Sequence, residues 1–206
     1  MIRLMDLSIS GCAILFLWPI MIAVVVLSGV FIGLPPIFVS ERRGLNGTVF
    51  RHIKIRSMLA GPQRGRVFFE LDRINWFGRF LRSSHLDETP DLLHILAGQM
   101  SLVGPRPLLL KALEPVDGSV RQTVKPGWTG PAQLWLLRRG LLSKELQIRL
   151  DNHYVRRRSP MYNCRILAAT VRYFFFGARL NLSPSATPDR ITYQNNGFEY
   201  LPKNQS

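Results

Sequence analysis

The sequence predicts a mostly helical α+β protein in which an N-terminal membrane anchor precedes one small basic domain. The first observation is a long apolar segment, Leu7 to Ser40, that contains no charged side chain. The second is charge, because the 206 residues include 27 Lys and Arg but 13 Asp and Glu, a formal net charge of +14. We expect so basic a protein to bind something anionic: nucleic acid, a phosphorylated small molecule or membrane headgroups.

The apolar segment is the first element, and it is longer than the roughly 20 residues that cross a bilayer once. A cleavable signal peptide is the alternative, but Pro19 interrupts the run, and Arg42 and Arg43 follow it without a small-residue cleavage site. Arg3 precedes the segment, so the positive-inside rule favours neither orientation. Two geometries stay open: a straight span kinked at proline, or a re-entrant helix that breaks at Trp18-Pro19 and returns to the same face.

The basic domain follows with a strand and two helices. Gly47–Met58 alternates as a strand does. Trp76–Leu86 places aromatic residues at helical spacing beside arginines, which predicts an amphipathic helix at a membrane interface. Thr89–Asp91 is typical of a helix start, with a cap, a proline and an acid, and we expect this helix to close at Gly98.

A further helix is predicted to begin at Ser159-Pro160. Four arginines recur beside it at every seventh residue: Arg158, Arg165, Arg172 and Arg179. This spacing keeps them in one slowly drifting stripe next to an apolar, aromatic face. Such a helix suits an anionic membrane surface, although a plain solvated face would carry the same charges. The expected organisation is an anchor over residues 1–40, a domain over 41–182 and a loosely ordered polar tail over 183–206.

An acidic pair, Asp87 and Glu88, directly precedes the second predicted helix. Most such dipeptides are solvated caps, but a carboxylate can also attack phosphorus if cations offset its repulsion from the phosphoryl group. For unit charges about 4 Å apart this repulsion is on the order of 4 kcal/mol at an effective dielectric of 20. Arg82, Arg106 and the helix N-terminus are placed to offset it. A cation-surrounded carboxylate in a membrane-anchored basic protein therefore predicts phosphoryl chemistry on a lipid.

Seven short motifs follow one another along the chain. They are RLMD at 3–6, ERRGLNG at 41–47, KIRSM at 54–58, DRINWFGRFLRSSHLDETPDLLHIL at 72–96, GQMSLVGPRP at 98–107, KPGWTGPAQ at 125–133 and DNHYVRRRS at 151–159. In this order they are highly specific, and the chain from residue 3 to about residue 170 resembles the small bacterial sugar transferases, which are monotopic phosphoglycosyl transferases.

The resemblance implies transfer of a phosphosugar from a nucleotide diphosphate sugar to a polyprenol phosphate, with undecaprenyl phosphate as the expected acceptor. It implies a covalent aspartyl-phosphosugar intermediate on Asp87, with Glu88 as the partner acid and Mg²⁺ held by both. It implies a re-entrant helix-break-helix, a catalytic domain on the cytoplasmic face of the bacterial inner membrane, contact with anionic lipids and the first membrane step of glycoconjugate assembly. Oligomeric state, sugar and nucleotide base stay open.

Further roles are implied residue by residue. Arg82 and Arg106 fall on phosphate-binding positions, and the side chains supporting substrate binding fall on Pro105, Pro107 and Arg56. The sequence departs from the family pattern in several places. Ile2 replaces a basic residue, Trp18 replaces the serine at the helix break, and Asn163 replaces a late aspartate. Around the acidic pair, His85 replaces a serine and Thr89 replaces a leucine.

Two other classes of function are possible. A non-catalytic, membrane-docked basic protein would explain the charge and the anchor, but it would not need an acidic pair among arginines. A nucleic-acid binder would use the positive charge against phosphates. Because many basic residues alternate with membrane-type aromatics, we do not expect nucleic acid as a partner.

Overall fold

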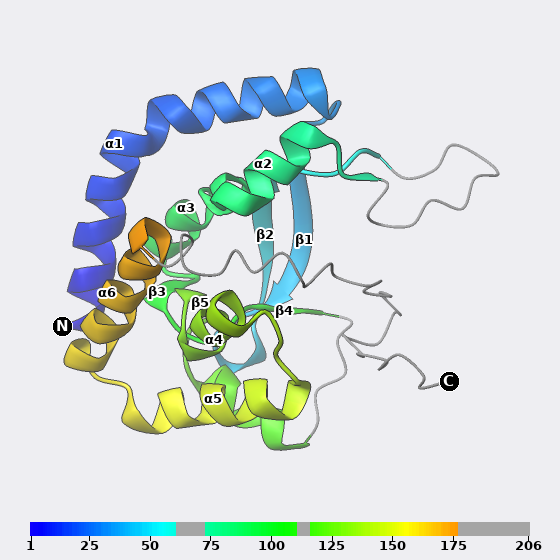
Figure 1. The fold of residues 1–206 in the computed structure, drawn as a ribbon. Helices are drawn as coiled ribbons and strands as arrows, with labels where there is room; N and C mark the ends of the chain where they lie inside the picture. The colour runs from blue at the N-terminus through cyan, green and yellow to red at the C-terminus, as the bar shows by residue number, and fades with distance from the viewer. Residues whose placement is uncertain (61–72, 111–115, 177–206) are drawn as a thin grey trace, which may run out of the picture.

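The computed structural model describes residues 1–60, 73–110 and 116–176, and these form the mostly helical α+β protein that was predicted (Figure 1). Arg179, the last arginine of the expected stripe, and the tail over residues 183–206 lie outside the described residues.

Helix α1, Ile2–Phe31, is one hydrogen-bonded element with Pro19 inside it. By length and composition it could cross a membrane. Most of its large apolar side chains are exposed, as expected of a helix surrounded by lipid. Figure 1 shows that α1 bends: its first half runs beside α6 and α3, and its second half turns across α2.

Polar groups attach both halves of α1 to the rest of the fold. Asp6 is buried and accepts hydrogen bonds from the Ser101 hydroxyl and the Leu102 N–H, at 2.9–3.0 Å. Near the other end, the Ser28 hydroxyl donates to the carbonyl of Arg56 at 2.7 Å.

The main sheet has three antiparallel strands in the order β2-β1-β4. Strand β1, Ile37–Arg43, pairs with β2, Val49–Ile55, and β4, Leu108–Leu109, pairs with the other edge of β1. Asn46 and Gly47 both have positive φ in the turn between β1 and β2, a backbone conformation that asparagine and glycine adopt more readily than other residues. The predicted strand is confirmed as β2. Strand β1 was not predicted, because its apolar first residues continue the membrane segment in sequence.

The remaining elements pack around a second, parallel pair of strands, β3, Ser101–Val103, and β5, Gly127–Thr129. The elements around this strand pair are the 3₁₀ segment η4, Val116–Thr123, and three helices: α4, Pro131–Arg139, α5, Lys144–Arg157, and α6, Pro160–Phe176. The main core joins β3 to these helices and to α3 through ten buried residues: Phe50, Leu92, Ile95, Met100, Leu102, Val103, Val124, Leu134, Tyr154 and Ile166. The predicted helix start at Ser159-Pro160 is confirmed by α6.

The two helices expected around the acidic pair are present. Helix α2, Trp76–Ser84, is amphipathic: Phe77 and Leu81 are buried, whereas Trp76 and Phe80 are exposed. Helix α3, Asp91–Leu96, follows the pair, and Gly98 has the positive φ of a helix end. The expected cap was wrong in detail, because the Thr89 hydroxyl donates backwards to the Leu86 carbonyl and caps no helix N–H.

Candidate active site

The acidic pair lies in one turn of 3₁₀ helix, η3, Leu86–Glu88, between α2 and α3. His85 enters this turn with a left-handed backbone, φ 57°, which reverses the chain after α2. From Leu86 through Ala97 the backbone dihedrals stay helical. The pair therefore sits at the N-terminal end of a continuous helical segment.

Asp87 is almost buried, with 9% of its surface exposed. The Ser57 hydroxyl donates to Asp87 Oδ2 at 3.4 Å, and Arg82 Nε donates to that hydroxyl at 3.1 Å. Arg82 thus reaches the carboxylate through a serine. Burial, followed by the charge of Glu88, raises the pKa of Asp87.

Glu88 has direct cationic partners. Lys54 Nζ contacts Oε1 of Glu88, and the Arg106 guanidinium lies 3.3 Å from the same oxygen. Burial alone would raise the pKa of Glu88, but Lys54 and Arg106 outweigh it and hold the pKa at about 2. Glu88 is therefore ionised at neutral pH.

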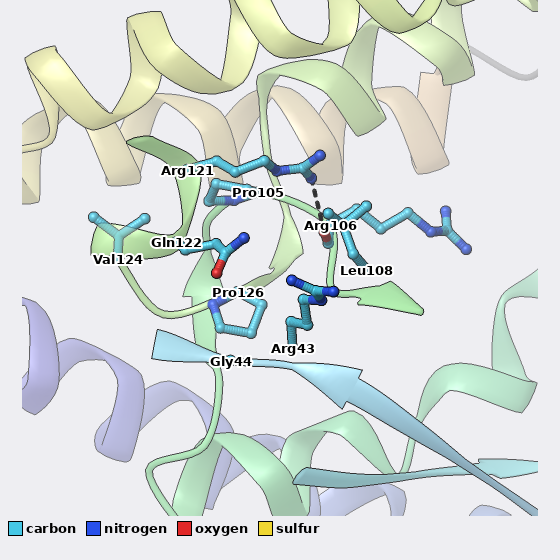
Figure 2. A pocket seen from close by; sticks show the side chains of 9 residues that line it. All are labelled: Arg43, Gly44, Pro105, Arg106, Leu108, Arg121, Gln122, Val124 and Pro126. Atoms are coloured by element: carbon cyan, nitrogen blue, oxygen red, sulfur yellow. Dashed lines mark hydrogen bonds between the residues drawn. The ribbon is translucent and has the colours of Figure 1, made fainter. Parts of the chain in front are cut away.

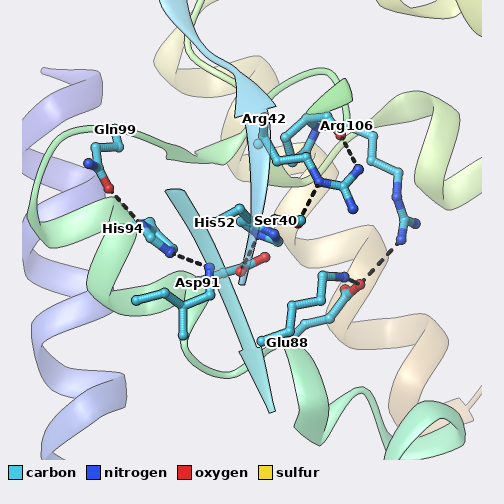
Figure 3. Close-up of polar contacts among 12 residues, drawn as sticks. Ser40, Arg42, His52, Glu88, Asp91, His94, Gln99 and Arg106 are labelled. Carbon is cyan, nitrogen blue, oxygen red and sulfur yellow. Dashed lines mark hydrogen bonds and ion pairs between the residues drawn. The ribbon is translucent and has the colours of Figure 1, made fainter. Parts of the chain in front are cut away.

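An open cleft begins at Glu88. Its charged end is lined by Arg42, His52, Lys54, Glu88, Asp91 and Arg106, most of which Figure 3 shows converging from β1, β2, the start of α3 and the loop after β3. Its other end is apolar, with Trp128, Leu136, Leu137, Leu167, Val171 and Phe174. Burial and the neighbouring Arg106 lower the pKa of Arg42. The two guanidinium groups repel each other, and a bound anion would reduce this repulsion.

A buried ion pair supports the loop that carries Arg106. Arg121 lies 3.0 Å from Asp151, and both side chains are almost inaccessible. The Arg121 guanidinium also donates to the Arg106 carbonyl at 2.9 Å (Figure 2). On the same loop the Pro105 carbonyl accepts from the Gly127 N–H at 2.8 Å. These contacts hold the Arg106 backbone while leaving its side chain, half exposed, to reach Glu88.

The structure brings together most of the residues predicted for the site. Glu88, Arg106 and Pro107 line the cleft, and Asp87 and Arg82 lie beside it around Ser57. Pro105 lies on the other side of the loop, in a small pocket that Figure 2 shows.

Three predicted residues lie elsewhere. Arg56 donates to the Leu34 carbonyl after α1 and does not line the cleft, so its role in substrate binding stays a prediction. Trp18 and Pro19, the predicted helix break, lie inside α1, which continues as one bent helix from Ile2 to Phe31 and does not break there.

Sequence reasoning missed Lys54, Ser57 and Arg42 as site residues. Strand alternation could have indicated Lys54, because alternate residues of a strand share one face. His52 and Lys54 share one face of β2, and both line the cleft. Nothing local links Ser57 to Asp87, since the contact joins residues 30 positions apart.

The carboxylates fit Mg²⁺ in donor type. Among the described residues no group of three or more His, Cys, Asp and Glu side chains is placed to hold a metal ion. Mg²⁺ often uses only one or two protein carboxylates and completes its shell with water and substrate phosphates. Asp87, whose hydrogen-bond partner is the neutral Ser57 hydroxyl, is the less engaged carboxylate of the pair.

The apolar helix and the cation-lined cleft together define a membrane-associated class of protein whose site suits phosphate groups. Residues 1–177 match the sequence profile of the family described as "Bacterial sugar transferase", and the chain belongs to this family. The resemblance drawn from the seven motifs is confirmed.

Three relatives illustrate the range of the family. The chain is 36% identical over 181 residues to the UDP-glucose:undecaprenyl-phosphate glucose-1-phosphate transferase of Xanthomonas campestris pv. campestris. The aligned region covers 81% of this chain and 37% of that protein. The chain is 36% identical over 164 residues to the uncharacterized sugar transferase EpsL of Bacillus subtilis (strain 168), covering 78% and 80%. It is 30% identical over 181 residues to an Escherichia coli (strain K12) protein with the same name as the first, covering 82% and 39%. The chain thus spans less than half the length of the two glucose-1-phosphate transferases.

Proposed function

We propose that this protein is a phosphoglycosyl transferase that moves a sugar phosphate from a UDP-sugar to undecaprenyl phosphate, the first membrane step of a glycoconjugate pathway. The observation that carries the proposal is the Asp87–Glu88 pair at a cleft lined by Lys54, Arg42 and Arg106. The names of the relatives support the two substrates. Family membership weighs against a non-catalytic, membrane-docked protein.

In the first half-reaction an Asp87 oxygen attacks the phosphorus that bears the sugar. A bond forms between that oxygen and phosphorus, the phosphoanhydride P–O bond breaks, and uridine monophosphate leaves with the bonding electron pair. In the second half-reaction a phosphate oxygen of undecaprenyl phosphate attacks the same phosphorus. The bond to Asp87 breaks, its carboxylate is restored, and undecaprenyl diphosphate sugar is released.

The surroundings favour Asp87 over Glu88 as the nucleophile. The ionised Glu88 is paired with Lys54 and Arg106, and these cations lower its basicity. The raised pKa of Asp87 makes its carboxylate the more basic of the two, and Ser57 is its one hydrogen-bond partner in the described part of the chain.

The proposal includes a Mg²⁺ ion, which Asp87 and Glu88 would hold. When bound, it would neutralise charge on the diphosphate and so reduce the repulsion that a carboxylate nucleophile meets. Lys54 and Arg106 reduce that repulsion from the protein side, because both lie beside the carboxylates.

The attachment of α1 supports a re-entrant anchor. A straight helix of 30 residues would be ~45 Å long, enough to cross the bilayer core. Yet Arg3 near its start donates to the Ile95 carbonyl at 2.5 Å, and the Phe31 carbonyl at its end accepts from Asn75 at 2.7 Å. A crossing would break one of these attachments. A bend near Pro19 keeps both, with the domain on the cytoplasmic face where UDP-sugars are available.

The test is to incubate the purified protein with UDP-sugars and undecaprenyl phosphate and to measure uridine monophosphate release. Asp87→Asn is expected to abolish turnover, and without acceptor the unmutated protein should gain the mass of one sugar phosphate, located on Asp87. Chelation of Mg²⁺ should stop the reaction. Turnover by Asp87→Asn would refute the covalent mechanism.

Two arginines provide a matched comparison. Arg82→Ala is expected to lower the rate by orders of magnitude, because Arg82 reaches Asp87 through Ser57. Arg172 is exposed on α6, in the predicted membrane-facing stripe, and its replacement by alanine should mainly weaken binding to anionic vesicles. Equal kinetic effects would contradict this division of roles.

A further inference from the structure

A buried pair of side chains lines the charged end of the cleft. His52 Nε2 lies 2.7 Å from Asp91 Oδ1, and the two side chains are only 1% and 5% exposed (Figure 3). His52 comes from β2, and Asp91 comes from the first turn of α3, three residues after Glu88. Both residues line the cleft together with Glu88.

This pair is less engaged than the polar groups behind it. His94 stacks on His52 with ring centres 5.4 Å apart, accepts from the Ile53 N–H at 3.0 Å and contacts Gln99 Oε1 at 2.6 Å, so both of its ring nitrogens have partners. His52 Nδ1 has no hydrogen-bond partner among the residues that the structure describes. His94 therefore links α3 to β2 through its hydrogen bond with Ile53, and its stacked ring holds the plane of the His52 ring.

The Asp91 carboxylate has spare acceptor capacity. A carboxylate offers about four lone-pair positions, and within the described ranges the one close side-chain contact recorded for Asp91 comes from His52. A buried carboxylate with so few partners is costly, and a well-packed apolar pair would often serve stability better. A ligand hydroxyl that donates to Asp91 would fill one of the unused acceptor positions.

The position of Asp91 indicates which part of the substrate it meets. Because the backbone hydrogen bonds between His85 and Leu93 join residues three apart, Asp91 lies one turn beyond Glu88 on the same side, and both line the cleft next to Asp87. In a UDP-sugar the sugar is joined through one oxygen to the phosphorus that Asp87 would attack, whereas the nucleoside lies beyond the second phosphate. The hydroxyls of the sugar are thus the donors nearest to Asp91.

We infer that Asp91 accepts a hydrogen bond from a hydroxyl of the transferred sugar and that His52 is the positioning residue that orients its carboxylate. This inference rests on the proposed function and adds to it the residue that selects the sugar. A buried acceptor discriminates strongly, because a sugar that lacks the hydroxyl, or presents it in the other configuration, leaves the carboxylate unpaired.

The experiment measures kcat/KM for uridine monophosphate release with the best UDP-hexose, with its epimers and with its monodeoxy analogues. In the unmutated protein one hydroxyl should stand out, and its removal should lower kcat/KM by about tenfold or more. Asp91→Asn and His52→Phe should reduce that discrimination by a similar factor. The control is Asp151→Asn, which disturbs the support of Arg106 and should lower kcat/KM for all UDP-sugars in equal proportion.

A binding measurement covers the case in which an Asp91 variant folds poorly. In the Asp87→Asn background, Asp91→Glu retains the charge but shifts it, and it should weaken binding of the UDP-hexose while leaving the affinity for UDP unchanged. Weakened UDP binding would assign Asp91 to the nucleotide and overturn the inference, as would equal losses of kcat/KM for every sugar in Asp91→Asn. If the unmutated protein released no uridine monophosphate from any UDP-sugar, the proposed function itself would fail.

Discussion

Asp87 and Glu88 are neighbours in the chain, yet their surroundings move their pKa values in opposite directions. Asp87 is desolvated and next to a like charge, so its pKa is raised. Glu88 is also desolvated, but Lys54 and Arg106 hold its pKa at about 2. This separation gives one carboxylate the basicity of a nucleophile and keeps the other as a fixed negative charge.

The raised pKa of Asp87 predicts that the residue reduces stability. With a folded-state pKa above the ordinary 3.8, the ionised carboxylate destabilises the fold at pH values above that raised pKa, and the effect is absent at pH values below 3.8. Asp87→Asn is therefore expected to raise the free energy of unfolding at pH 7, although it abolishes activity. Denaturant unfolding at pH 7 and below pH 3.8 tests this, and a variant that is less stable at pH 7 would contradict it.

Glu88 is predicted to behave in the opposite way. A pKa lowered from 4.5 to about 2 stabilises the fold by about 3 kcal/mol above pH 4.5, and this stabilisation is lost as the pH falls through about 2. Glu88→Gln should lower the free energy of unfolding at pH 7 by up to that amount, with the difference disappearing in strong acid. The same titration of unfolding free energy against pH measures it, and equal losses at every pH would point to packing instead of charge.

At the scale of elements, the position of α2 against β2 controls the surroundings of Asp87. Gly78 in α2 lies so close to the chain after β2 that an added Cβ would be 2.2 Å from the Ser57 carbonyl oxygen. Ser57 is the residue that joins Arg82 to Asp87. A side chain at position 78 would thus separate the arginine from the carboxylate.

Gly78→Ala is accordingly expected to destabilise the protein by about 1–3 kcal/mol and to lower kcat. The control is Gly11→Ala in α1, where an added Cβ meets nothing within 4 Å. Thermal unfolding and uridine monophosphate release, measured for both variants, give the comparison. Wild-type activity in Gly78→Ala would show that the Ser57 contact is dispensable.

For the whole molecule, the attachment of both ends of α1 predicts that the N-terminus and the domain lie on one side of the membrane. In a Cys12→Ser, Cys164→Ser background, one new cysteine is inserted after Met1 and another replaces the exposed Arg157. In intact cells both should resist a membrane-impermeant thiol reagent until the membrane is permeabilised. Labelling of the N-terminal cysteine alone would indicate a true span and refute re-entry.

Patterns that repeat along the chain determined several features from the sequence alone. The uncharged run predicted the apolar helix, alternation predicted β2, and helical spacing predicted α2 and α6. The seven ordered motifs identified the family, because their order and spacing are local properties of the chain. Chemistry singled out Asp87 and Glu88, since a nucleophile for phosphorus needs cations near it, and arginines stood close in sequence.

Only the tertiary structure decided which cations serve which carboxylate. Lys54 reaches Glu88 across 34 positions of sequence, Ser57 connects Arg82 to Asp87, and His52 meets Asp91 from another element. The same holds for β1, whose apolar start continues the membrane segment until pairing with β2 identifies it as a strand. These contacts depend on how β2, α2 and α3 pack together, and such distant pairings leave no periodic signal in the sequence because each partner is compatible locally with many other arrangements.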